Sequence, residues 1–368
     1  MSLLITGLGT ALPEHTVPQM DTYTHTREFC CETDEHRRVM ELIYQGSGVS
    51  SKASVVIEKP DGVNYGTKFF LPRHDLEDRG PTTNDRMQQY EQHALPLALQ
   101  SSQAALSQAG QDLSEITHLV TVSCSGFSAP GFDIGLIEEL GLSRDCSRTH
   151  VGFMGCHGSF NGLRVAKGYV EADPSAVVLM CSVELCSLHY HYGWSIEKVI
   201  ANALFADGSA AVVCRSGANK PAQTPKYELI RNASHLLADS SHAMSWKIGD
   251  HGFEMTLSQK VPSMIDKHLA PWMSSFLAKE GLTIQDVKGW AIHPGGPRIL
   301  DACLSALSLS GEHVEAARET LSAHGNMSSA TVLFLLNRLK QQPIQGPVVA
   351  LGFGPGLTIE AMLLRSET

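Results

Sequence analysis

Apolar positions along the chain follow two different spacings, which predict an alternation of strands and helices. Short runs rich in valine, isoleucine and leucine predict buried strands over residues 3–8, 116–122, 176–182, 209–213, 227–230, 289–292, 347–352 and 358–365. Longer amphipathic stretches predict helices over residues 21–44, 84–109, 261–279, 298–307 and 328–340. Asn84 and Asp85 offer an N-cap for the longest helix. Because strands and helices alternate, we expect a mainly parallel sheet in each half of the chain.

The second half of the chain repeats the order of elements in the first half. Between them, residues 217–225 are rich in glycine, asparagine, lysine, proline and glutamine, a composition typical of a boundary. We therefore predict two halves, residues 1–217 and 218–368, that pack as one pseudo-duplicated, layered α/β body.

Composition and charge narrow the class of protein. The 368 residues are 43% apolar and 18% charged, which indicates a globular protein with part of its surface buried in an oligomer. The net charge of −10 argues against a surface for nucleic acid or anionic membrane. No apolar run reaches the roughly 18 residues of a membrane span, and residues 1–15 do not resemble a signal peptide. The nine cysteines never form a C-x-x-C pair, so we expect reduced thiols in the cytoplasm and no disulfide framework or zinc site.

One cysteine lies where a strand turns into a helix. In the segment VGFMGCHGSFNGLRVAKGYV, Gly155 allows a sharp turn and Cys156 follows it at the start of a small-residue helix. The positive end of a helix favours the thiolate, which is the reactive form of cysteine. Cys156 is therefore a candidate nucleophile, and the alternative is a buried cysteine that packs as a small apolar side chain.

Two further stretches place polar side chains beside turns. His293 follows the strand in WAIHPGGPRIL, and Asn326 precedes a helix in LSAHGNMSSA. Taken singly, His293 fits a structural role as well as a catalytic one, and Asn326 fits a helix cap. Together with Cys156 they form a coherent set for acyl transfer, in which His293 and Asn326 donate hydrogen bonds to a thioester carbonyl and stabilise an enolate. We also expect His293 to pair with the Cys156 thiolate and to lower the thiol pKa.

The chain resembles the chalcone and stilbene synthase superfamily, the type III polyketide synthases, from about residue 82 to its end. The matching segments occur in the order of that family and are ITHLVTVSCSGFSAPG, the cysteine segment, ALFADGSAA, GDHGFEMTLSQKVP, HPGGPRIL, HGNMSSATVLFLL and GFGPGLTIE. The resemblance implies a thiolase-like αβαβα fold and a homodimer. It also implies Cys156 as nucleophile, His293 and Asn326 as the decarboxylation pair, acyl-CoA and malonyl-CoA as substrates, and no cofactor.

Residues that match the family's substrate cavity follow from the same resemblance. Phe205 and Met255 match two gatekeeping positions, of which the second is phenylalanine in the plant enzymes. Other matched positions are expected to shape the cavity, and they are Cys124, Ser125, Cys186, His189, Trp246, Ser328 and Gly354. Trp246 replaces a small residue of the plant enzymes, so we expect a narrower wall there.

Three other positions complete the expectations. Lys52 is a candidate for contact with a coenzyme A phosphate, with a solvated lysine as the alternative. His157 adjoins the nucleophile, but successive helical residues point about 100° apart, so we assign it a structural role. Ala129 replaces a methionine that reaches into the partner subunit in plant enzymes, which implies a weaker contact across the dimer.

The leading hypothesis is a type III polyketide synthase that loads an acyl starter on Cys156, extends it with malonyl units and cyclises the product. Cavity positions favour an alkylpyrone, an alkylresorcinol or tetrahydroxynaphthalene. One alternative is a single-condensation enzyme resembling β-ketoacyl carrier-protein synthase III, and another is an inactive dimerising subunit. The sequence does not decide the starter, the number of extensions or whether a carrier protein delivers the acyl group.

Overall fold

The computed structural model describes residues 2–59, 65–218 and 225–367. In this part of the chain one large sheet is formed by β1 (Leu3–Ala11), β4 (His118–Ser123), β5 (Ser147–Gly152), β6 (Val177–Leu185), β7 (Asp207–Ser216), β8 (Tyr227–Leu236), β11 (Gly289–Ile292), β12 (Gln345–Gly354) and β13 (Thr358–Glu367). The strand order is β11-β12-β13-β8-β1-β7-β6-β4-β5. Only residues 3–5 of β1 pair with residues 227–229 of β8, so this short contact joins two blocks of strands.

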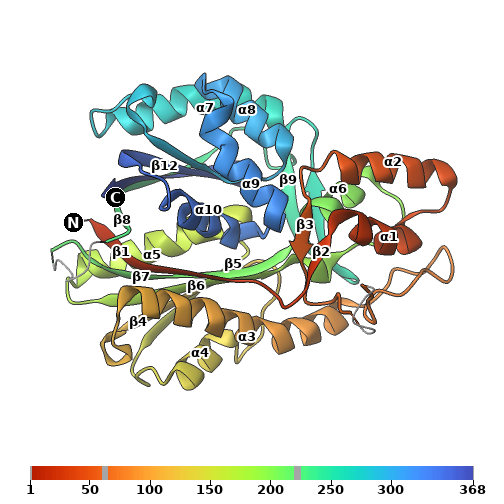
Figure 1. The fold of residues 1–368 in the computed structure, drawn as a ribbon, viewed down its shortest axis with the longest axis horizontal. Coiled ribbons are helices and arrows are strands. Elements are labelled where there is room, and N and C mark those ends of the chain that lie inside the picture. The colour runs from red at the N-terminus through yellow and green to blue at the C-terminus, as the bar shows by residue number, and fades with distance from the viewer. Residues whose placement is uncertain (1, 60–64, 219–224, 368) are drawn as a thin grey trace.

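Helices cover the two blocks on both sides. They are α1 (Gln19–Cys30), α2 (Asp34–Gln45), α3 (Thr83–Ala109), α4 (Phe132–Leu140), α5 (Gly158–Ala172), α6 (Ile196–Leu204), α7 (Val261–Ala278), α8 (Pro297–Leu307), α9 (Glu315–His324) and α10 (Thr331–Leu339). Figure 1 shows α7 and α8 outside one block, α5 and α10 between the blocks, and α3 and α4 outside the other. This is the predicted αβαβα layering.

The prediction of mainly parallel sheets is wrong. Parallel pairs are β11 with β12, β4 with β6 and β4 with β5, whereas the other five neighbouring pairs are antiparallel. Only residues 355–357 separate β12 from β13, which is too short for the crossover that a parallel pair needs. Alternation of apolar runs along the chain does not reveal such reversals.

Several elements were not predicted. They are α4, α6, α9 and a hairpin of β9 (Met244–Gly249) and β10 (Gly252–Leu257). In this hairpin Trp246 lies opposite Met255. The N-cap of α3 is also two residues earlier than predicted, since Thr82 caps the helix and Asp85 completes a capping box.

The two predicted halves share one apolar core. A single cluster of buried residues includes Leu3 of β1, Phe160 of α5 and Leu351 of β12. Of the predicted boundary segment, residues 219–224 lie outside the described residues, and the division into residues 1–217 and 218–368 stays a prediction. None of the helices in the described ranges is long and apolar enough to cross a membrane.

Candidate active site

Cys156 lies at the turn between β5 and α5, as predicted. The backbone of Gly155 has a φ of +72°, and a Cβ built there would lie 2.4 Å from the Cδ atom of Pro355. Glycine is therefore required for both conformation and space. Residues 155–157 form a short 3₁₀ turn that leads into α5, and the Cys156 side chain is buried within it.

Asn326 approaches the nucleophile from the turn after α9. Its Nδ2 atom lies 4.0 Å from the Sγ atom of Cys156. The Ser328 backbone N–H donates to the Oδ1 atom of Asn326 at 2.9 Å, which orients the amide N–H groups toward the thiol. The backbone of Asn326 is fixed as well, because its N–H donates to the Leu204 carbonyl and its carbonyl accepts from Ala206 N–H.

His293 follows β11, where its backbone N–H donates to the Leu351 carbonyl at 2.8 Å. Its imidazole is buried, yet neither ring nitrogen has a hydrogen-bond partner. Burial lowers the pKa of His293 to about 3, and the charge of nearby His157 adds to this effect. The ring is therefore neutral at neutral pH and keeps one N–H free to donate. The predicted pairing of His293 with the Cys156 thiolate is not formed.

The thiol of Cys156 is not activated in the way that the sequence suggested. Burial raises its pKa to about 11, while hydrogen bonds from Ser328 and Asn326 act in the opposite direction. The negative charge of Glu184 also raises it. The expected lowering of the pKa by a helix terminus and by His293 is thus wrong, because desolvation of the thiolate is the largest effect on this thiol.

A small cavity of about 20 Å³ opens beside Cys156. It has room for about one water molecule. Most of the predicted cavity residues line it, namely Phe205, Met255, Cys124, Ser125, Cys186, Trp246 and Ser328. The Nε1 atom of Trp246 donates to the Cys124 carbonyl at 2.8 Å, which holds the indole in the wall.

Two predicted cavity residues do not line this cavity. The Nε2 atom of His189 donates to the Ser125 carbonyl at 2.7 Å, and its Nδ1 atom accepts from the Phe253 backbone N–H at 3.0 Å. His189 thus supports the wall from behind, with its ring 5.5 Å from that of Trp246. At Gly354, a Cβ would approach the His157 ring to 2.3 Å, so this glycine makes room for His157.

The ring of His157 faces away from the nucleophile, as predicted. Its Nδ1 atom contacts Asn161 at 2.8 Å, and its Nε2 atom contacts the Thr358 hydroxyl at 2.6 Å. Both ring nitrogens are therefore engaged in structural hydrogen bonds.

Lys52 is neither solvated nor available to a coenzyme A phosphate. Its side chain is fully buried, and its Nζ atom donates to the Asn202 carbonyl at 2.5 Å. The sequence prediction is wrong because the segment around Lys52 folds as a short strand, β3 (Ser51–Ala53), whose lysine points into the protein.

Glu184 is a residue of the site that the sequence analysis missed. Its fully buried carboxylate accepts hydrogen bonds from Cys124 N–H at 3.0 Å, from the Ser125 hydroxyl at 2.7 Å and from the Ser329 hydroxyl. Burial raises the pKa of this carboxyl. A single carboxylate within the apolar run VVLMCSVEL was the available signal, since buried charges are rare without a specific role.

These groups define a class of enzyme. A buried thiol, an amide N–H aimed at it and a neutral imidazole with free nitrogens suit transfer of an acyl group to sulfur and donation to a thioester carbonyl. Among the described residues, no group of three or more histidine, cysteine, aspartate or glutamate side chains is arranged to hold a metal ion. Fold and site together are those of a thiolase-like condensing enzyme.

Comparison with known families gives the same assignment. The profile described as "Chalcone and stilbene synthases, N-terminal domain" matches residues 2–218, and that described as "Chalcone and stilbene synthases, C-terminal domain" matches residues 228–368. The chain belongs to the chalcone and stilbene synthase family, the type III polyketide synthases. Enzymes of this family are acyltransferases that catalyse decarboxylative condensation, use acyl-CoA and malonyl-CoA, and need no further cofactor.

Similar proteins come from several groups of organisms. The "Alpha-pyrone synthesis polyketide synthase-like Pks18" of Mycobacterium tuberculosis is 33% identical over 366 residues, which cover 98% of this chain and 90% of that protein. The "1,3,6,8-tetrahydroxynaphthalene synthase" of Streptomyces peucetius is 32% identical over 98% of this chain and 92% of that protein. The crystal structure of PKS-I from the brown alga Ectocarpus siliculosus superposes with a TM-score of 0.91 at 31% identity, covering 99% of this chain and 98% of that one.

Proposed function

We propose that Cys156 carries the growing polyketide and that His293 and Asn326 drive its extension. The sulfur of Cys156 attacks the carbonyl of the starter thioester, and the new thioester bond forms as the bond to coenzyme A breaks. The proton of the Cys156 thiol passes to the departing sulfur, so coenzyme A leaves as the thiol. Malonyl-CoA then loses carbon dioxide, while N–H groups of His293 and Asn326 donate to the enolate oxygen. The enolate carbon attacks the acyl-cysteine carbonyl and releases the Cys156 thiolate. The observation that carries this proposal is the Asn326 amide held 4.0 Å from the Cys156 sulfur.

We propose that the pantetheine arm reaches Cys156 from an apolar cleft of about 330 Å³ on the other side of Phe205. Leu204 lines this cleft, whereas its neighbour Phe205 lines the cavity at Cys156. The cleft lies between α2, α6 and the start of α8, and exposed Arg298 at its edge suits a phosphate. Among the described lining residues Arg298 is the only cation, which favours a coenzyme A ester over an acidic carrier protein as the donor.

We propose a small product, formed from a short starter and malonyl units and closed to a pyrone or to an aromatic of the tetrahydroxynaphthalene type. The indole of Trp246, which is held by its hydrogen bond to Cys124 and lies opposite Met255, narrows this wall and supports short chains there. The names of the Mycobacterium and Streptomyces relatives include both product types.

We propose a homodimer formed through the β5 end of the sheet. β5 is the last strand in the sheet order, so one side of it is available for pairing. Exposed Phe127 and Met154 lie on the turns next to this end, and a large apolar side chain in water favours association. Ala129 lines a pocket of about 440 Å³ beside Phe127, which leaves space at this face.

The test is incubation of the purified protein with labelled malonyl-CoA and acyl-CoA starters from acetyl to palmitoyl, read by mass spectrometry. We expect products that contain two or more malonyl-derived units and that are absent with Cys156→Ala. A single condensation would instead support a ketosynthase of the carrier-protein type. The absence of any product, with Cys156 still reactive toward iodoacetamide, would contradict the use of coenzyme A starters.

A further inference from the structure

Lys52 has a buried amino group that the catalytic site does not use. It lies on β3, which pairs with β2 (Thr16–Pro18) and packs beside α9 (Figure 1). Its Nζ atom donates to the carbonyls of Asn202 at 2.5 Å and of Ala203 at 3.4 Å. These carbonyls belong to the last turn of α6, where helices leave carbonyl groups without an intrahelical partner. Burial lowers the pKa of Lys52 to about 7, and its protonated form also complements the helix dipole.

The residue that follows this helix end is Phe205, which matches a gatekeeping position of the family. Phe205 directly follows α6, lines the cavity and packs in one apolar cluster with Cys156. The same short segment is bonded to the catalytic amide, since Phe205 forms a parallel β-bridge with Asn326. Asn326 N–H donates to the Leu204 carbonyl, and Ala206 N–H donates to the Asn326 carbonyl. A shift of the α6 terminus would therefore move the gate and Asn326 together.

The strand that carries Lys52 contacts the other side of the same unit. The Ser51 hydroxyl donates to the Ala323 carbonyl at 3.2 Å, close to the turn that presents Asn326. At Gly325 in this turn, a Cβ would lie only 3.3 Å from the Lys52 Cβ atom. Lys52 thus lies between the end of α6 and the end of α9.

The surroundings of Lys52 leave the helix carbonyls as its hydrogen-bond partners. Tyr190 and Tyr44 present their ring faces to Nζ at 5.1 Å and 5.9 Å. The Asp207 carboxylate is bonded instead to Val55 N–H and to the backbone and hydroxyl of Ser187. A buried amino group with this geometry is not explained by an ion pair.

We propose that Lys52 is a positioning residue. It acts through the last turn of α6 and holds the Phe205 gate and the Asn326 amide in their positions beside Cys156. This inference rests on the proposed roles of Phe205 and Asn326. Gln19 stabilises the same helix turn, because its Nε2 atom donates to the Ala203 carbonyl at 2.7 Å.

The first test compares Lys52→Met, which removes the donors at similar length, with Lys52→Arg, which keeps them. The control is Lys198→Met, a partly exposed lysine of the same helix that faces Glu254. Turnover is divided by the folded fraction of each variant, measured by circular dichroism, so that unfolded protein does not count. We expect kcat to fall about tenfold in Lys52→Met with little change in KM, because a small displacement of a catalytic group costs rate. Lys52→Arg should recover most of the loss, and Lys198→Met should match the wild type.

A second readout does not require any polyketide to form. The alkylation rate of the Cys156 peptide is measured with iodoacetamide and with a bulky maleimide. We expect the bulky-to-small rate ratio to rise about threefold in Lys52→Met, because a displaced gate admits larger reagents. If the wild type makes no polyketide but this ratio changes, the proposed function fails and the positioning role stands.

Unchanged kcat per folded enzyme together with an unchanged reagent ratio would overturn the inference. If Lys52→Met does not fold, Gln19→Leu removes the other donor to the same turn and should shift both readouts in the same direction. Failure of Gln19→Leu to shift either readout would overturn the inference in that case.

Discussion

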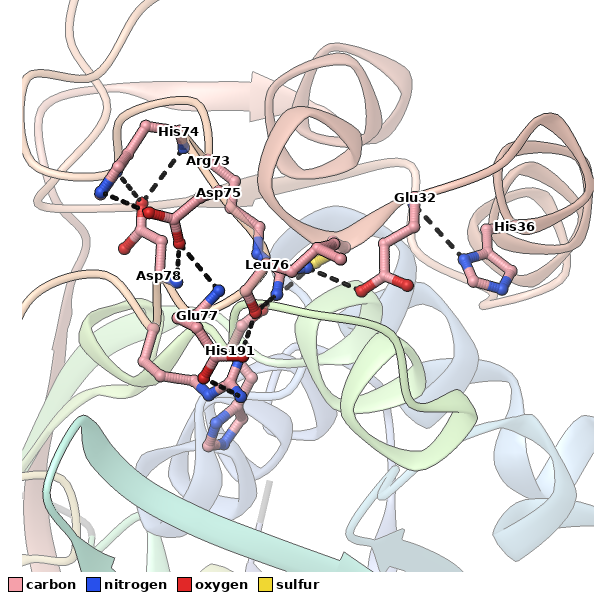
Figure 2. Close-up of polar contacts among 11 residues, drawn as sticks. Glu32, His36, Arg73, His74, Asp75, Leu76, Glu77, Asp78 and His191 are labelled. Carbon is pink, nitrogen blue, oxygen red and sulfur yellow. Dashed lines mark hydrogen bonds and ion pairs between the residues drawn. The ribbon is translucent and has the colours of Figure 1, made fainter.

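Two polar regions of this protein differ in whether their polar side chains have hydrogen-bond and ion-pair partners. In the surface loop of residues 73–78, hydrogen bonds and ion pairs join several charged side chains to nearby partners, as Figure 2 shows. Arg73 pairs with Glu32 at 2.8 Å, and Asp78 accepts from the ring of His74 at 2.6 Å. The Asp75 carboxylate accepts from backbone N–H groups two and three residues along the chain.

In the catalytic region, in contrast, side-chain contacts are long or absent. Cys156 and Asn326 are 170 residues apart in sequence, and their contact is a long one at 4.0 Å. His293 is buried with no partner for either ring nitrogen, although buried polar atoms are normally bonded. The difference teaches that the loop is organised for its own stability, whereas the site keeps donors free for a substrate that brings the acceptors.

The largest expected effect is at the nucleophile. Cys156→Ala should lower polyketide formation at least about a thousandfold, because no acyl-enzyme can form. Product is measured by mass spectrometry beside Cys31→Ser, which alters a thiol outside the cavity lining and should retain activity. Equal loss in both variants would show that the assay reports folding and not the role of Cys156.

The next largest effect is expected at the two proposed donors to the enolate. His293→Gln and Asn326→Ala should each lower malonyl-CoA decarboxylation about a hundredfold, because one donor to the enolate is lost. Loading of the starter on Cys156, followed as the mass of the Cys156 peptide, should persist in both variants. Loss of loading with normal decarboxylation would contradict these roles.

Strain at the nucleophile turn gives the third effect. Gly155→Ala should lower the free energy of unfolding by about 2 kcal/mol, because alanine is strained at positive φ and its Cβ meets Pro355. Gly168→Ala is the matched control in α5, where a Cβ has no neighbour within 4 Å, and it should raise stability by about 0.5–1 kcal/mol. Urea denaturation measures both, and a stable Gly155→Ala protein would contradict the required turn.

A smaller effect concerns the pH dependence of the thiol. The wild-type pKa of Cys156 is about 11, and the Glu184 charge contributes to raising it. Glu184→Gln removes the negative charge, so the thiolate forms at lower pH and the alkylation rate rises at a fixed pH below the wild-type pKa. The pH profile of Cys156 alkylation should therefore move to lower pH, whereas exposed Glu254→Gln should leave it unchanged. An unmoved profile in Glu184→Gln would show that its charge does not act on the nucleophile.

The smallest effect is expected in the surface loop. His74→Ala removes an exposed ring that contacts Asp78 and should lower the free energy of unfolding by only about 0.5 kcal/mol. Thermal and urea denaturation measure this change, and turnover should match the wild type. A large loss of turnover would show that the surface loop also contributes to catalysis, which would contradict the difference described between the two regions.

The contrast also explains what the sequence could predict. Cys156, His293 and Asn326 each lie beside a turn with a local signature, so their approximate placement followed from neighbouring residues. β11 has the predicted bounds of residues 289–292, because its apolar run is compact and ends at His293 and Pro294.

Features that depend on distant contacts were not predictable in this way. The direction of the strands, the β9–β10 hairpin with Trp246 and the burial of Lys52 all depend on segments that meet only after folding. The raised pKa of Cys156 has the same origin, since it reflects desolvation and a carboxylate on β6. Glu184, which the sequence analysis missed, differs from these features because its carboxylate within an apolar run was a signal in the sequence.

The most direct test of the account is mass spectrometry of the enzyme quenched during turnover, with peptides assigned to each cysteine. The account predicts that the Cys156 peptide carries the starter acyl group and a ladder of malonyl-derived extensions. It also predicts that the peptides of Cys124 and Cys186, which line the same cavity, remain unmodified. A ladder on either of those cysteines, or product formation with Cys156 never acylated, would contradict the central claim.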